Sequence, residues 1–237
     1  MSAADPQHVA HLTGSMSAAY VIAPELALLF DLDGVLIDST AAVVRQWRLF
    51  ADEHGLDETV VLARIHGRRT IDNVGELLAG RPQSEIDRAA SRLEQRDLTD
   101  NHDIVALPGA RELLAALPPH RWACVTSAGR ELARARLGAA GLPLPPVLVG
   151  AESVANGKPD PEGYLRAAEL LGVPIQRCVV FEDAPAGIHA GHAAGATVVA
   201  LTTTHTPDQL RTATSAIDHL VPNLSHVTLE GTGDSLH

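Results

Sequence analysis

Residues 26–39 read LALLFDLDGVLIDS. The apolar run before Asp31 lacks the alternation of a half-buried strand, so it predicts a strand buried on both faces of a parallel sheet. This run ends in Asp31 and Asp33, and Gly34 allows a sharp turn out of the strand. Open α/β sheets bind ligands at the carboxyl ends of their strands, so we expect both aspartates to face such a crevice. A plain turn is the simpler alternative. A calcium-binding loop is disfavoured because no closing Glu follows at the required spacing.

The overall composition is that of an acidic globular protein. Of its 237 residues, 46% are hydrophobic, which suits one large α/β domain or a domain with an insertion. The net charge is −11 and no basic stripe occurs, which argues against a nucleic acid partner and against an anionic membrane surface. No apolar run has the length of a transmembrane helix. We expect a monomer or a small homo-oligomer.

The cysteines and the first 25 residues bear on the compartment. Cys124 and Cys178 each lie in an apolar, strand-like run, so buried thiols in a reducing compartment are the simplest interpretation, with a disulfide as the alternative. Residues 1–25 have neither the basic start nor the apolar stretch of a secretory signal. Their small and polar residues predict a disordered extension. We therefore expect a cytoplasmic protein.

The remainder of the chain divides into one helical block and a strand–helix repeat. Residues 39–104 show helical spacing and no strand pattern, so they are predicted to form an all-helical insertion whose first helix is capped by Asp38 or Ser39. Strand-like runs then alternate with helices, and the predicted strands are 121–126, 146–149, 177–181 and 197–201. A short edge strand is expected within 216–227. The predicted fold class is α/β, with a doubly wound, Rossmann-like parallel sheet built from residues 26–38 and 105–230.

Two further segments carry residues suited to binding an anion. Ser127 and Ala128 follow a predicted strand and precede a helix, where a hydroxyl and free amides can hold an anion. Helix capping by Ser127 is an equally good alternative. Lys158 is the single lysine among 18 basic residues. Because Arg is used everywhere else, this compact ammonium predicts a role in a site, although base composition also explains a preference for Arg.

A second pair of acids ends another buried strand. Glu182 and Asp183 follow the run at 177–181 and precede a turn that contains Gly187. Carboxylates from two strands at one edge can bind a hard cation, and Mg²⁺ suits a partial carboxylate shell completed by water and phosphate. Capping of the following helix is the alternative. Four acids in one crevice would repel one another without a cation, which favours a metal together with Lys158.

These four segments, in this order, resemble the motifs of the haloacid dehalogenase-like hydrolase superfamily. The resemblance covers nearly everything after residue 25. It implies that Asp31 is the nucleophile that forms an aspartyl-phosphate. It also implies that Asp33 protonates the leaving alcohol and then activates water.

The same resemblance implies the binding roles. Ser127 and the amide of Ala128 would hold the phosphoryl group, and Lys158 would bridge Asp31 and phosphate. The implied Mg²⁺ ligands are Asp31, Asp33 through its carbonyl, and Asp183, helped by Glu182. The helical insertion would be the cap that closes over the site and selects the substrate.

Softer similarities concern the substrate. Segments 66–72, 181–188 and 202–206 look like those of glycerol-phosphate and deoxysugar-phosphate phosphatases, which implies a small phosphorylated sugar or polyol as substrate. Candidate substrate-facing residues in the insertion are His66, Arg68 and Arg69. A solvated basic turn is an equally good interpretation of them.

Other activities of the superfamily require residues that differ from those of this chain. Dehalogenases lack the acid present here as Asp33, and phosphonate hydrolases use a lysine of the cap, where this chain has none. A β-phosphoglucomutase-like mutase remains the alternative, although His66 and Thr70 stand where we align the Lys and Arg that such mutases look to carry for the second phosphate. A non-catalytic binding protein on the same fold is the second alternative.

Overall fold

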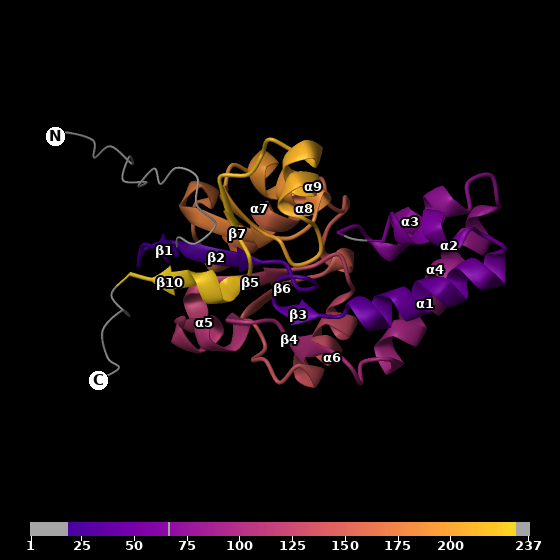
Figure 1. Ribbon diagram of the computed structural model, residues 1–237, viewed down its shortest axis with the longest axis horizontal. Coiled ribbons are helices and arrows are strands. Elements are labelled where there is room, and N and C mark those ends of the chain that lie inside the picture. Colours follow the sequence, from indigo (N-terminus) through magenta and orange to yellow (C-terminus); the bar gives the residue numbers. More distant parts are fainter. Residues whose placement is uncertain (1–18, 66, 231–237) are drawn as a thin grey trace.

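A computed structural model describes residues 19–65 and 67–230, and within them six strands form one parallel sheet (Figure 1). Their spatial order is β6 (Val147–Val149), β5 (Trp122–Val125), β2 (Ala27–Phe30), β7 (Cys178–Glu182), β8 (Thr197–Leu201) and β9 (His219–Val221). From β2 the chain builds outward through β5 and β6, and then crosses to the other side to begin β7. The strand order therefore reverses between β2 and β7, where such sheets bind ligands.

The central strand β2 has the burial that its sequence predicts. All four of its residues are buried, with β5 on one side and β7 on the other. Phe30 packs on one face of the sheet, where its ring stacks on that of Phe181 at 5.0 Å between centroids. Leu29 packs on the opposite face. Burial on both faces explains why the run is continuously apolar.

Helices cover both faces of this sheet. One face is covered by α5 (Ala110–Ala116) and α6 (Arg130–Ala139). The other face is covered by α7 (Glu162–Leu171), α8 (Pro185–Ala194) and α9 (Pro207–Ala213). The predicted doubly wound α/β fold is confirmed, although α9 was not foreseen in the sequence. It begins with Thr206, whose hydroxyl accepts a hydrogen bond from the amide of Gln209.

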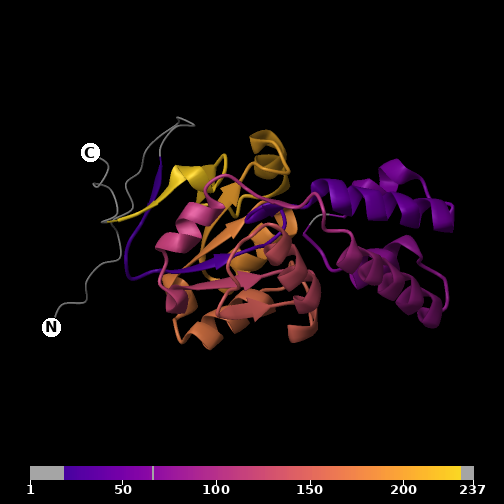
Figure 2. The same cartoon turned by 90° about the horizontal axis from the view of Figure 1, so that it is seen from below.

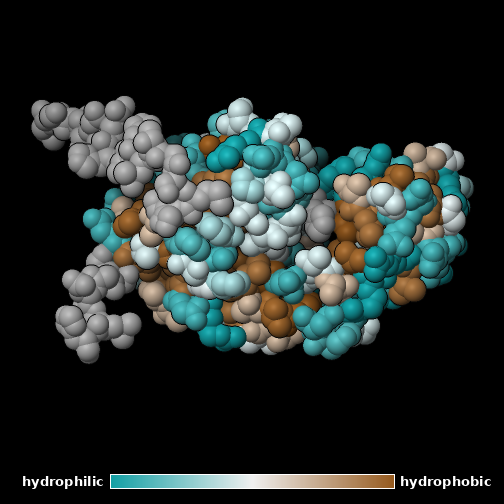
Figure 3. Space-filling model, viewed as in Figure 1, coloured by the Kyte–Doolittle hydropathy of each residue, from teal (hydrophilic) through white to brown (hydrophobic). Residues whose placement is uncertain are grey.

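The helical insertion stands beside the sheet-bearing part (Figures 1 and 2). Its described elements are α1 (Thr40–His54), α2 (Glu58–Leu62), α3 (Thr70–Leu77) and α4 (Gln83–Thr99). They enclose a hydrophobic cluster of their own, which includes Trp47, Phe50 and Leu93. Figure 3 shows hydrophobic residues gathered on the side of the insertion that faces the sheet. The chain enters through β3 (Ile37–Asp38) and leaves through β4 (Val105–Ala106), which pair antiparallel.

One predicted boundary is wrong. The disordered extension was expected to reach residue 25, but Tyr20–Ile22 form strand β1, which pairs in parallel with β10 (Val227–Leu229). Ile22 is wholly buried in the core, and burial of this apolar side chain favours order over disorder. Residues 1–18 of that prediction lie outside the described residues. No helix in the described part of the chain is long and apolar enough to cross a membrane.

Candidate active site

The carboxyl ends of β2 and β7 bring three acids together. We call Asp31, Glu182 and Asp183 the buried acid group; all three are buried, and one oxygen from each lies within 4.8 Å of the others. The two strands run in parallel with Phe30 opposite Phe181, so the residues that follow emerge at the same edge. The predicted meeting of the two acidic motifs is therefore what the structure shows.

Lys158 joins the two halves of this group. Its Nζ donates to Asp31 Oδ1 at 2.7 Å, to Glu182 Oε1 at 2.6 Å and to the carbonyl oxygen of Val125 at 3.1 Å. Burial disfavours its charge, but Asp31 and Glu182 outweigh that effect and raise the pKa of Lys158 above its usual value. The single lysine of the chain is thus a buried, protonated cation inside the acid group.

Glu182 already has a donor at each oxygen. Besides Lys158, its Oε1 accepts from the Tyr164 hydroxyl at 2.7 Å. Its Oε2 faces the backbone amides of Asp183 and Ala184 at 3.1 and 3.4 Å. A Cβ on Gly187 would lie 1.7 Å from Oε1, so only glycine lets α8 approach this closely. Glu182 is therefore built to hold Lys158 against Asp31, and Asp31 and Asp183 are left as the better candidates for direct metal ligands.

One lysine does not neutralise three buried acids. Burial raises the pKa of Asp31 to about 7, an effect that Lys158 opposes and Glu182 increases. Burial, with Glu182 beside it, also raises the pKa of Asp183 well above its usual value. Asp183 Oδ1 is buried without a hydrogen-bond partner among the described residues. The group therefore offers oxygen ligands, lacks positive charge and has one carboxylate oxygen without a partner. These properties suit a hard divalent cation such as Mg²⁺.

The turn after β2 lies directly over Asp183. Gly34 has a φ of 83°, and a Cβ there would lie 2.2 Å from Asp183 Oδ2. The Thr204 hydroxyl donates to the same oxygen, while the Thr203 hydroxyl donates to the carbonyl of Gly34. Gly34 is therefore needed both for the left-handed backbone and for the close approach, and the loop after β8 completes the wall of the site.

The Asp33 carboxylate is bound by residues outside the buried acid group. Its Oδ1 accepts from the Ser39 hydroxyl at 2.5 Å and from Arg136 Nη1 on α6 at 2.7 Å. Ser39 precedes α1 but makes no side-chain cap, since its hydroxyl is used on Asp33. The Asp33 carboxylate is thus in an ion pair that the sequence analysis did not foresee.

Two of the predicted phosphate-binding residues, Ser127 and Lys158, help to line a small cavity, and Ala128 is not among its lining residues. The Ser127 hydroxyl donates to the carbonyl of Gly67 in the insertion at 3.1 Å. The amide of Ala128 points to Thr126 Oγ1 at 3.1 Å. Helix α6 is capped by Gly129, so the alternative that Ser127 caps the helix is wrong.

The candidate residues of the insertion differ in their positions. Arg69 lines the cavity; its guanidinium pairs with Asp72 and donates to the carbonyl of Ala155 at 3.1 Å. Arg68 forms a two-pronged pair with Glu76 on α3 and is not among the cavity-lining residues. His66 lies outside the described residues. Of the two arginines, which are both described, Arg69 alone lines the cavity.

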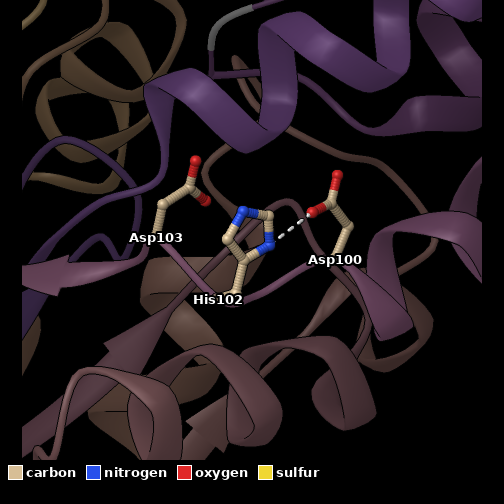
Figure 4. A group of neighbouring side chains, drawn as sticks. All are labelled: Asp100, His102 and Asp103. Carbon is tan, nitrogen blue, oxygen red and sulfur yellow. Dashed lines mark ion pairs between the residues drawn. The ribbon is translucent and has the colours of Figure 1, made fainter.

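A second set of metal-type side chains lies at the end of the insertion. We call Asp100, His102 and Asp103 the surface acid group, and its ligand-type atoms also lie within 4.8 Å of one another (Figure 4). Arg45 pairs with both Asp100 and Asp103, and His102 Nδ1 lies 3.2 Å from Asp100. The hydrogen bonds from Arg45 lower the pKa of Asp100 to about 2. Both carboxylates of this group are already bound by Arg45.

Comparison with known proteins agrees with this geometry. The family profile of the haloacid dehalogenase-like hydrolases matches residues 26–195. The chain belongs to this family. Hexitol phosphatase A of Escherichia coli (strain K12) is 48% identical to this haloacid dehalogenase-like hydrolase over 178 residues, covering 73% of this chain and 81% of that protein. The 2-deoxyglucose-6-phosphate phosphatase 2 of Saccharomyces cerevisiae is 34% identical over 222 residues, covering 85% and 89%.

Solved structures agree as well. The crystal structure of a hydrolase from Pseudomonas syringae superimposes with a TM-score of 0.75 at 28% identity, covering 84% of this chain and 94% of that one. The predicted superfamily is thereby confirmed. Together with its phosphatase relatives, it makes this haloacid dehalogenase-like hydrolase a phosphatase.

Three residues around the site were missed in the sequence, namely Tyr164, Arg136 and Asp97. Each could have been recognised in the sequence as a polar residue at a position of a helix where the spacing predicts an apolar one. Arg136 shares its stripe on α6 with Leu132, Ala133 and Leu137. Asp97 lies on α4 in the stripe that contains Ile86, Ala90 and Leu93. A charge at an apolar position of a helix is costly unless it is paired, so both positions pointed to a partner in the folded protein.

Proposed function

We propose that this haloacid dehalogenase-like phosphatase hydrolyses small phosphorylated sugars or polyols through an aspartyl-phosphate on Asp31, with Mg²⁺ as cofactor. The observation that carries the proposal is the buried ion pair of Asp31 with Lys158, beside an unpaired oxygen of Asp183. A buried carboxylate held by a fixed ammonium stays available as a nucleophile and does not depend on solvent for its orientation.

The reaction has two displacement steps at phosphorus. In the first, Asp31 forms a bond to phosphorus while the ester P–O bond breaks, and the carboxyl proton of Asp33 passes to the leaving alcohol oxygen. In the second, a water molecule attacks phosphorus, its proton passes to Asp33, and the bond between phosphorus and Asp31 breaks. Inorganic phosphate and the original state of both aspartates result.

The remaining residues position the phosphoryl group. Lys158 is placed to neutralise an oxygen shared between Asp31 and phosphate, and the Ser127 hydroxyl faces the same cavity. Asp31 and Asp183 would hold Mg²⁺, with the carbonyl of Asp33 as the third protein ligand that the resemblance implies. A cation held there would supply positive charge beside the phosphoryl oxygens.

The choice of substrate class rests on the relatives and on one side chain in the cavity wall. Relatives named for hexitol phosphate and 2-deoxyglucose 6-phosphate act on phosphorylated sugars or sugar alcohols. The small cavity beside Lys158 also has Arg69 in its wall, and a guanidinium can donate hydrogen bonds to the hydroxyl groups of such a substrate. We place the enzyme in the cytoplasm, since Cys124 and Cys178 are both buried free thiols, as suits a reducing compartment.

The test is phosphate release from a panel of hexitol, glycerol, hexose and nucleotide monophosphates, with Mg²⁺ and again with EDTA. We expect release that requires the metal and is strongest on sugar or sugar-alcohol phosphates. Formation of glucose 6-phosphate from β-glucose 1-phosphate, faster than release of phosphate, would favour the mutase alternative. No reaction with any ester, for the wild type and for Asp31→Asn alike, would favour a binding protein.

A further inference from the structure

Arg136 lies between acids of two parts of the molecule. Its side chain is only 5% exposed, and its Nη1 donates to Asp33 Oδ1 at 2.7 Å. Its Nη2 lies 3.9 Å from Oδ1 of Asp97, which belongs to α4 of the helical insertion and whose side chain is 8% exposed. Helix α4 packs against α6, which carries Arg136. One buried guanidinium therefore connects the insertion to the predicted acid of the core.

The two contacts of Arg136 are unequal. The distance to Asp33 is that of a hydrogen-bonded ion pair, whereas 3.9 Å to Asp97 is too long for a hydrogen bond. Asp97 Oδ1 and Arg136 Nε are both buried, and neither has a hydrogen-bond partner in the described part of the chain. A buried carboxylate oxygen left unpaired is costly, so Asp97 is a strong potential partner for this guanidinium.

Other cations near Asp97 are already engaged. Arg96 pairs with Glu53 at 2.6 Å. Arg45 pairs with Asp100 and Asp103 of the surface acid group. Arg136 is consequently the cation best placed to satisfy Asp97, and a shift of its guanidinium toward Asp97 would weaken its contact with Asp33.

The contact between Arg136 and Asp33 conflicts with the proposed role of Asp33 as the acid that protonates the leaving alcohol. Arg136 and Ser39 both donate to the same oxygen, Oδ1, and hold the carboxyl toward α6. A proton donor must lie within hydrogen-bond reach of the leaving oxygen, which in the proposed reaction is bonded to phosphorus near Asp31. Release of the Asp33 carboxyl from Arg136 would allow it to turn there.

We propose that Arg136 is a positioning residue that exchanges Asp33 for Asp97, so that close packing of α4 on α6 frees the Asp33 carboxyl for acid–base catalysis. The inference rests on the proposed function, because it takes Asp33 as the acid. It adds a specific link between the insertion and the chemistry. When Arg136 pairs with Asp97, α4 packs closely on α6 and the Asp33 carboxyl is free to act as the acid. When Arg136 does not pair with Asp97, it stays bound to Asp33.

The test compares two leaving groups in the variant Asp97→Asn. The best aliphatic substrate of the panel releases a strongly basic alkoxide that needs a proton, whereas p-nitrophenyl phosphate releases a stable anion that needs none. We compare kcat/KM, which reports the steps up to departure of the leaving group. We expect kcat/KM to fall about 10-fold or more on the aliphatic ester and less than about 3-fold on p-nitrophenyl phosphate, within the range of general acid catalysis.

Matched variants keep the inference open to refutation. Asp103→Asn removes an acid that faces Arg45 instead of Arg136, so the ratio of the two kcat/KM values should stay as in the wild type. Asp97→Glu keeps the carboxylate and should restore most of the ratio. Arg136→Lys keeps a cation beside Asp33 but removes the fork that reaches both acids, so it should lower the ratio as Asp97→Asn does; it decides the matter if Asp97→Asn does not fold.

Equal losses on both esters in Asp97→Asn and Arg136→Lys would overturn the exchange and leave Asp97 as a packing residue. That result is distinct from a failure of the proposed function, in which the wild type itself would hydrolyse neither ester.

Discussion

Two acidic groups in this protein both hold their ligand atoms within 4.8 Å of one another, but they differ in burial and in the direction in which the pKa values of their acids are shifted. The buried acid group has three carboxylates around a single lysine, and burial raises the pKa of Asp31 to about 7. The surface acid group is answered by the fork of Arg45, whose hydrogen bonds lower the pKa of Asp100 to about 2. Ligand spacing alone therefore does not define a metal site; burial and a carboxylate oxygen without a described partner, Asp183 Oδ1, set the buried acid group apart.

The largest expected effect that separates the two groups is on turnover. Asp31→Asn removes the nucleophile and should lower kcat by about 10⁴-fold, as loss of a nucleophile does elsewhere. Asp100→Asn in the surface acid group should change kcat less than about 2-fold. Phosphate release measures both, and circular dichroism checks that each variant is folded. An Asp31→Asn variant that keeps more than a tenth of the wild-type rate would contradict the assignment of the nucleophile.

The second contrast concerns the metal. At about 100 times its dissociation constant, Mg²⁺ should raise the free energy of unfolding by about 2.7 kcal/mol, since it binds the folded state. Asp183→Asn should remove this gain, and Asp103→Asn should retain it. Urea unfolding with Mg²⁺ and with EDTA measures the difference. Retention of the gain in Asp183→Asn, or its loss in Asp103→Asn, would place the metal elsewhere.

A third contrast is between the pKa shifts of Asp97, in the last turn of α4, and Asp100, which follows that helix. Burial raises the pKa of Asp97 to about 6, so the folded state binds its proton more tightly than the unfolded chain does. The stabilisation that comes from this tighter proton binding is complete below the pKa of an Asp in the unfolded chain, near 4. It is lost as the pH rises through the folded-state pKa of about 6. Asp97→Asn should therefore be more stable than the wild type by on the order of 2 kcal/mol at pH 7.5, and this advantage should shrink as the pH falls toward 5.

Urea unfolding of both proteins at the two pH values tests this sign. Asp100→Asn is the control, because the lowered pKa of Asp100 predicts a loss of stability instead of a gain at pH 7.5. If Asp97→Asn were less stable at pH 7.5, the pairing of Asp97 with Arg136 would be stronger than the distance of 3.9 Å indicates.

The smallest effect expected is from the hydroxyl of Tyr164. Tyr164→Phe keeps the buried ring but removes the donor to Glu182 Oε1, so Lys158 and Asp31 lose some of their fixed geometry. We expect kcat to fall about 3- to 10-fold with little change in KM, because a hydrogen bond contributes about 1 kcal/mol net. Tyr20→Phe, at the other tyrosine, should leave kcat unchanged. A purely structural role of Tyr164 would lower the melting temperature and spare kcat.

The acids and the lysine of the site were predictable for physical reasons. Asp31 follows one continuously apolar run and the pair Glu182 and Asp183 follows another, and parallel strands end at one edge, so their meeting follows from topology. Lys158 stood out because Arg serves everywhere else in the chain. These inferences needed only the local pattern and the sheet.

What the sequence left undetermined depends on packing between distant segments. The pair of Asp33 with Arg136 joins residues far apart in the chain, and no local pattern chooses between that partner and the acid group. Strand β1 is three residues long, too short for a period to be recognised, and it forms because β10 lies beside it. Arg69 binds Asp72 and the carbonyl of Ala155 instead of facing solvent, because the insertion contacts the core at this point.

The short ribbon of β3 and β4 has a consequence for how such enzymes diversify. Ile37 stands opposite Ala106 and Asp38 opposite Val105, so the two ends of the helical insertion are held as neighbours in an antiparallel ladder. A segment anchored in this way can be exchanged for one of another length with little cost in loop-closure entropy. The fold thus offers a graft point, at which recombination can replace the helices that meet the substrate while the strand ends that carry the acids are inherited unchanged.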